Sequence, residues 1–189
     1  MSPPVPTLHV SLLRGINVGG RNRIPMADLR TLCDGIGWLD VRSYIQSGNL
    51  VFRSPGSPGE LERALGEAIE RRFGLEVPVI VRTAEEWPAY MRGNPFPDAS
   101  TKEPNLVMLA LAKSPPAPDA AARLEERAAS GERIARVGDA LWIHFAGGAT
   151  ATSRLSPAFL DRCAGSPVTT RNWRTVLALD ALVVAAGRA

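Results

Sequence analysis

The chain has 189 residues, of which 45% are hydrophobic and 22% are charged, which is enough apolar material for one large domain or two small lobes. The ordinary charged fraction argues against disorder across the chain. The net charge of +3 lies entirely within residues 99–189. It is too small for a protein that wraps a nucleic-acid duplex, although it permits a local basic patch.

The first half predicts six elements. An apolar run at 8–13 indicates a buried strand, and Pro25 suits the first turn of a helix whose apolar residues recur at helical spacing. Strands at 41–45 and 50–53 flank a tight turn at 46–49. Ser57, Pro58 and Glu60 form a capping box before a long helix, and a strand follows at 77–81. The order strand, helix, strand, strand, helix, strand is typical of a ferredoxin-like lobe.

The second half repeats this order imperfectly. Thr83 and Glu86 are expected to cap a short helix, and the run at 106–111 reads as a central strand. A helix at 119–129 then precedes two strands, 134–137 and 141–145, joined by Gly138-Asp139. Ser156 starts a short helix, and Thr170 is expected to cap a final helix from about Arg171. No closing strand is predicted. We therefore expect an α+β protein with a ferredoxin-like lobe at 1–82 and a related α+β lobe at 83–189.

Two glycine-bearing loops are expected to meet at one end of the first sheet. Residues 15–23 follow the first strand and residues 46–49 join the second and third strands, and the ferredoxin-like topology brings both to the same edge. Glycines there allow positive φ or close approach to a ligand, and Arg14, Arg21 and Arg23 add positive charge before the first acid, Asp28. The helix that begins near Pro25 adds backbone N–H groups.

This pattern predicts a site for a small anionic or phosphorylated ligand. The nine residues assigned to it are the following: Arg14, Gly15, Asn17, Gly19, Gly20, Arg21, Gln46, Ser47 and Asn49. The same residue types are also what tight turns require, so a purely structural role stays open. Two other functions are open as well. One is a single-stranded RNA or DNA binding module, and the other is a protein-interaction module without a small ligand.

Other chemistry has little support in the sequence. The loop at 15–20 lacks the Gly-Lys-Ser/Thr of a nucleotide-binding P-loop and the spacing of a dinucleotide fingerprint. His9 and His144 are isolated, and Cys33 and Cys163 have no Cys or His at ligand spacing, so neither a metal nor another cofactor is expected. No run reaches the ~18 apolar residues of a membrane span. With no signal peptide expected either, the prediction is a cytoplasmic protein.

Five segments resemble the signatures of the DUF1697 family, a bacterial group of unknown function. They are residues 12–20 (LLRGINVGG), 26–29 (MADL), 44–49 (YIQSGN), 94–96 (NPF) and 170–173 (TRNW). The resemblance covers almost the whole chain. It implies a small cytoplasmic α+β protein and supplies no reaction. Arg21 and Arg23 stand where the family pattern suggests lysines, so the charge is kept while any lysine-specific chemistry is lost.

Overall fold

A computed structural model describes residues 5–148, 150 and 153–188. The chain divides into two compact units, which we call the first and second lobes. The first lobe is Met1–Pro88 with Ala178–Ala189, and the second is Ala89–Leu177. The division predicted after residue 82 stays a prediction. The boundaries between the units fall within two helices, α3 (Trp87–Arg92) and α7 (Trp173–Gly187).

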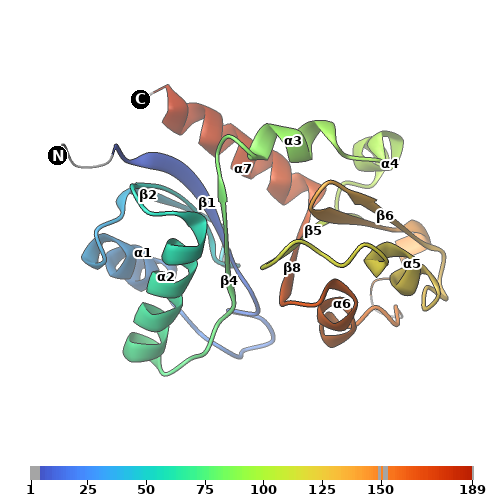
Figure 1. Ribbon diagram of the computed structural model, residues 1–189, viewed down its shortest axis with the longest axis horizontal. Helices are drawn as coiled ribbons and strands as arrows, with labels where there is room; N and C mark the ends of the chain where they lie inside the picture. The colour runs from blue at the N-terminus through green and yellow to red at the C-terminus, as the bar shows by residue number, and fades with distance from the viewer. Residues whose placement is uncertain (1–4, 149, 151–152, 189) are drawn as a thin grey trace. The chain divides into compact units, whose positions relative to one another are not determined.

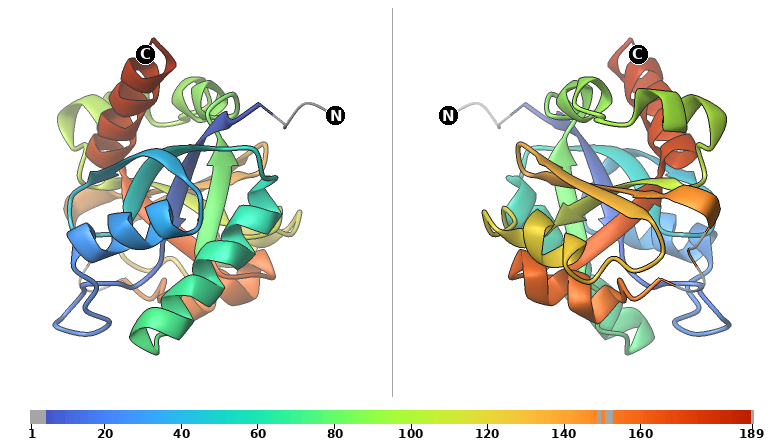
Figure 2. Two further views of the ribbon diagram at one scale, coloured as in Figure 1. Left: turned by 90° about the vertical axis from the view of Figure 1, so that its left-hand side faces the viewer. Right: turned by 90° about the vertical axis from the view of Figure 1, so that its right-hand side faces the viewer.

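The first lobe is a four-stranded antiparallel sheet with two helices on one face (Figure 1; Figure 2, left). Its elements in chain order are β1 (Thr7–Leu13), α1 (Met26–Gly35), β2 (Leu39–Tyr44), β3 (Asn49–Ser54), α2 (Pro58–Phe73) and β4 (Val79–Thr83). The strand order is β2-β3-β1-β4. The predicted capping box starts α2, because the Ser57 backbone N–H donates to the Glu60 carboxylate at 2.9 Å.

Large apolar side chains form the core between this sheet and its helices. Leu50 and Phe52 point from β3 toward α1 and α2 and are fully buried. The Trp38 ring, which lies just before β2, stacks on Phe52 with 3.6 Å between ring centroids and 4° between planes. Burial of such side chains stabilises each by about 1.5–3 kcal/mol, so this layer holds the sheet that carries the loops.

The second lobe has the same strand order in corresponding positions. Its elements are α4 (Pro97–Lys102), β5 (Val107–Ala112), α5 (Ala120–Glu125), β6 (Glu132–Val137), β7 (Ala140–Phe145), the 3₁₀ turn η1 (Ala146–Gly148), α6 (Pro157–Ala164) and β8 (Val168–Asn172). The sheet order is β6-β7-β5-β8, and α5 and α6 lie on one face (Figure 2, right). The predicted Gly138-Asp139 hairpin turn is confirmed.

The last strand corrects the sequence prediction. Residues 168–172 form β8 and pair with β5, whereas the sequence analysis expected no closing strand and a helix from Arg171. The physical reason is that Val168, Thr169 and Thr170 are β-branched and favour extended backbone. The helix cap is Asn172, whose Oδ1 accepts from the Thr175 N–H at 2.9 Å. The predicted helix at 119–129 is also shorter, since α5 ends at Glu125.

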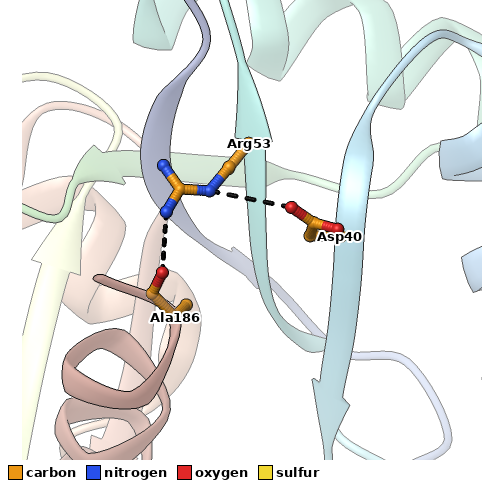
Figure 3. Close-up of polar contacts among 3 residues, drawn as sticks. All are labelled: Asp40, Arg53 and Ala186. Carbon is orange, nitrogen blue, oxygen red and sulfur yellow. Dashed lines mark hydrogen bonds and ion pairs between the residues drawn. The ribbon is translucent and has the colours of Figure 1, made fainter. Parts of the chain in front are cut away.

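The C-terminal part of α7 is attached to the first lobe by Arg53 of β3 (Figure 3). Its Nη2 donates to the Ala186 carbonyl oxygen at 2.7 Å, and its Nε lies 3.7 Å from the Asp40 carboxylate. The last carbonyl groups of a helix have no partner within the helix and carry partial negative charge. A guanidinium at that position therefore satisfies one of them. Within the described residues, no helix is both long and apolar enough to cross a bilayer.

Candidate functional site

The loop after β1 is an ordered turn held by its own asparagines. The Asn17 N–H donates to the Asn22 carbonyl oxygen at 3.1 Å, and the Arg21 N–H donates to that of Val18 at 3.0 Å. The Asn22 side chain returns to the Gly15 carbonyl oxygen at 3.0 Å. Asn17 and Asn22 have positive φ, as do Gly19 and Gly20. Asparagine and glycine tolerate this region best, so the composition of the loop follows from its shape.

Asn17 connects the two loops that the sequence analysis brought together. Its Nδ2 donates to the carbonyl oxygens of Ile24 at 2.9 Å and Gln46 at 2.8 Å, and its Oδ1 accepts from the Ile24 N–H at 2.9 Å. The prediction that the two loops lie at the same end of the sheet is therefore confirmed. Both amide hydrogens of Asn17 are committed to backbone oxygens, so this side chain fixes the position of one loop against the other.

The hairpin turn between β2 and β3 packs tightly under the first loop. The Gly48 carbonyl oxygen accepts from the Leu13 N–H at 2.9 Å. A Cβ on Gly48 would lie 2.6 Å from the Leu13 Cβ and 2.8 Å from Ile16 Cδ1, and φ is +72°. Asn49 is fully buried, with Nδ2 donating to the Tyr44 carbonyl oxygen at 3.1 Å and to Ser47 Oγ at 2.9 Å. This turn is built for close packing.

The solvent-facing part of the site carries the positive charge. Gly19, Gly20, Arg21 and Arg23 are exposed, as are Gly15 and Gln46. Across the residues that the structure describes, neither Arg21 nor Arg23 has an ion-pair partner. Arg14 is half-buried and makes further contacts of its own. No acid occurs between Arg14 and Ala27. We call residues 14–23 together with 46–49 the loop rim.

Helix α1 begins directly after this loop without a side-chain cap. Its N-cap residue is Pro25, which makes no side-chain hydrogen bond to the first turn. The first backbone N–H groups of a helix have no partner within it and carry partial positive charge, which attracts anions. Asp28 is the acid in this first turn and partly meets that charge.

The two histidines are buried parts of the packing. His9 Nε2 lies 2.9 Å from Thr7 Oγ1 and 3.2 Å from the Ser54 carbonyl oxygen, and its ring stacks on Phe52. Burial lowers the pKa of His9 below its ordinary 6.5. His144 Nε2 lies 3.2 Å from the Glu103 carboxylate in the second lobe.

Both cysteines are buried and free. Burial raises the pKa of Cys33 to about 12 and also raises that of Cys163. Because a thiolate is the reactive form, both side chains are poor nucleophiles at neutral pH. Among the described residues, no group of three or more His, Cys, Asp or Glu is arranged to hold a metal ion.

Two surface cavities are lined by residues outside the loop rim. One, of about 450 Å³, lies between α1 and α2 and is lined by Asp28, Thr31, Arg71 and Arg72 among others. The other, of about 640 Å³, is in the second lobe and is lined by Arg123, Arg127, Arg154 and Phe159 among others. The sequence analysis missed the second cavity. Arg123 and Arg127 are four residues apart, a spacing that would place them on one side of the predicted helix at 119–129, and this is the one signal available.

Comparisons with known proteins support this α+β fold. A solved structure of a conserved bacterial protein from Streptococcus pneumoniae is similar, with a TM-score of 0.72 and 22% sequence identity over 94% of this chain and 99% of that one. At that identity the likeness shows the fold alone. No curated protein matches the chain. The model of the family described as a protein of unknown function, DUF1697, matches residues 7–142. The chain therefore belongs to the DUF1697 family.

Proposed function

We propose that the first lobe binds a small anionic or phosphorylated ligand at the loop rim. The observation that carries the proposal is the exposed run Gly19-Gly20-Arg21. It presents two glycines with positive φ next to a guanidinium that has no ion-pair partner among the described residues. Side-chain-free backbone lets an anion approach the N–H groups closely, and guanidinium groups bind oxyanions with paired, charge-assisted hydrogen bonds.

The residues of the predicted site divide into two roles under this proposal. Arg14, Arg21 and the backbone N–H groups of the exposed residues Gly15, Gly19 and Gly20 supply positive charge to the ligand. The amides of Asn17 and Asn49 hold the loops in place, as their backbone hydrogen bonds support. Gln46 and Ser47 border the same rim and provide neutral donors and acceptors. Because these buried or half-buried amides already hold the loops in place, fewer groups have to become ordered when the ligand binds.

The test is a calorimetric titration with inorganic pyrophosphate at low ionic strength. The double substitution Arg21→Ala with Arg23→Ala is expected to weaken binding at this site by roughly 10- to 100-fold, the cost of losing charge-assisted hydrogen bonds. The matched control is Arg42→Ala, an arginine of β2 that lies outside the rim. Unchanged binding in the double variant, or an equal loss in the control, would remove the site. A single-stranded RNA oligonucleotide that binds through Arg21 while pyrophosphate does not would favour the nucleic-acid alternative.

We also propose that the first lobe is ferredoxin-like. The element order β1-α1-β2-β3-α2-β4 and the strand order β2-β3-β1-β4 support this assignment. The same orders recur in the second lobe, with β5, α5, β6, β7, α6 and β8 in the corresponding places. The assignment matters for the site, because this topology is what places the β1–α1 loop beside the β2–β3 turn.

A further inference from the structure

The cavity of the second lobe concentrates positive charge. It has a volume of about 640 Å³, and its lining includes Arg123, Arg127, Arg154 and one acid, Glu126. Arg123 and Arg127 come from α5 and the turn that follows it, whereas Arg154 comes from the segment that leads to α6. Segments far apart in the sequence thus supply three guanidinium groups to one concave surface.

A fourth arginine lies beside the cavity. The Arg162 guanidinium carbon is 5.5 Å from the centroid of the Phe159 ring, and that of Arg127 is 4.6 Å from the same centroid. Arg123 Nη2 donates to the Arg162 backbone carbonyl oxygen at 3.3 Å. Cation–π contacts of this kind hold guanidinium groups in place while leaving N–H donors available for another partner.

The arginines of this cluster make no ion pairs within the described chain. None of Arg123, Arg127, Arg154 and Arg162 has an ion-pair partner among the residues that the structure describes. Like charges gathered around one cavity repel each other, and the repulsion is stronger near a protein surface than in bulk water. A bound anion would relieve this repulsion.

From these observations we propose that the cavity of the second lobe binds a phosphorylated small molecule. Arginine is the residue best suited to hold phosphate oxygens in paired hydrogen bonds. The volume exceeds that of a single phosphate group and falls within the range of small-molecule sites. Glu126 lies in the lining and would accept a hydrogen bond from a hydroxyl or amino group elsewhere on the same ligand. This site is separate in sequence from the loop rim and does not depend on it.

The experiment is a titration of the full chain with inorganic pyrophosphate at low ionic strength, followed by calorimetry and by thermal unfolding. The variants are Arg154→Ala and Arg127→Ala, and both residues are exposed, so the fold is expected to persist. Each variant is expected to lose roughly 10- to 100-fold in affinity at this site. Without anion, Arg154→Ala is expected to unfold at a temperature equal to or above that of the parent, because it relieves repulsion and leaves the two cation–π contacts to Phe159 in place. Arg127→Lys, which keeps the charge, is expected to retain part of the binding.

Two controls test whether the binding belongs to this cavity. Arg136→Ala changes an exposed arginine of β6 that does not line the cavity, and it is expected to bind as the parent does. The double variant at Arg21 and Arg23 is expected to leave binding at the cavity unchanged. The proposal for each site can therefore be rejected without rejecting the other. Binding that is absent in the parent, or unchanged in Arg154→Ala and Arg127→Ala, would overturn the proposal. So would an RNA oligonucleotide that binds these arginines and is not displaced by pyrophosphate.

Discussion

The two lobes share one topology but differ in what fills it. Each has two helices on one face of a sheet with equivalent strand order. The strand register aligns Arg82 of β4 with Arg171 of β8, since each is paired with the corresponding residue of the central strand, Val10 or Leu109. Both arginines are buried, and the Nη1 of each donates to the carbonyl oxygen of the preceding residue, at 2.9 and 2.8 Å.

The differences lie in the core and in the loops. The first core holds the Trp38–Phe52 stack, whereas the second includes the small side chains of Ala110, Ala112 and Ala164. The loop after β1 has glycines and exposed arginines, whereas residues 113–119 after β5 include three prolines. Two equivalent frameworks therefore carry different surfaces, which are the loop rim in the first lobe and the arginine-lined cavity in the second.

The largest expected effect is on the aromatic core of the first lobe. Phe52→Ala is expected to lower the free energy of unfolding by about 3–5 kcal/mol, because it removes a fully buried ring that stacks on Trp38. The corresponding residue of the second lobe by register is Ile143. Ile143→Ala is expected to cost about 2–5 kcal/mol but less than Phe52→Ala, since no aromatic stack is lost. Urea unfolding measures both, and a larger loss at Ile143 would contradict the difference between the cores.

The hairpin turns give a second matched pair. Gly48→Ala is expected to lower the free energy of unfolding by about 2–5 kcal/mol, because strained φ adds to the clash with Leu13 and Ile16. Gly138 occupies the corresponding turn with φ +61°, and nothing lies within 4 Å of the position that a Cβ would take there. Gly138→Ala is therefore expected to cost only about 1–2 kcal/mol. Equal losses in denaturant unfolding would show that the tight packing under the loop rim is not as described.

A smaller effect is expected at the attachment of α7. Arg53→Ala is expected to cost about 1.5–3 kcal/mol, the usual contribution of a hydrogen bond from a charged donor, because the Ala186 carbonyl loses its partner. Arg42→Ala on the neighbouring strand serves as the control. Hydrogen exchange should show faster exchange in residues 178–187 of the Arg53 variant alone. If that segment exchanged equally in both variants, the tether in Figure 3 would not hold the helix.

The smallest effect is a dependence of stability on pH. Burial lowers the pKa of His9, so the native state prefers the neutral ring, and its Nδ1 has no hydrogen-bond partner among the described residues. Because the pKa of His9 is lower in the native state, its full contribution to the unfolding free energy is present above pH 6.5, the ordinary value. That contribution is lost as the pH falls from 6.5 toward the lower native pKa. Met108 occupies the corresponding position of the second lobe, so methionine is the substitution chosen. His9→Met is expected to reduce the pH dependence of the unfolding free energy below pH 6.5. A profile identical to that of the parent would exclude His9 as the cause.

Much of the framework was predictable from local pattern. The run at 8–13, the Ser57–Glu60 capping box and the Gly138-Asp139 turn each depend on neighbouring residues, and each is present in the structure. Strand β8 was missed because its threonines also suit a helix cap. The convergence of the two loops was predictable once the order of elements was known, since topology alone brings them together.

What the sequence could not show depends on residues far apart in the chain. The hydrogen bond from Arg53 to Ala186 joins positions separated by 133 residues, and nothing near either one signals it. The cavity of the second lobe needs Arg154 beside Arg123 and Arg127, which only the folded chain brings together. The commitment of Asn17 and Asn49 to backbone oxygens likewise requires the folded geometry of both turns.

The most direct test of anion binding at the loop rim is an amide NMR titration. The chain carrying Arg154→Ala, which is expected to weaken anion binding at the cavity of the second lobe, would be titrated with inorganic pyrophosphate at low ionic strength. The account predicts that the largest saturable shifts occur at the backbone amides of Gly19, Gly20 and Arg21. The account would be contradicted if the chemical shifts of the rim amides did not change as pyrophosphate is added, or if the changes were confined to other parts of the chain.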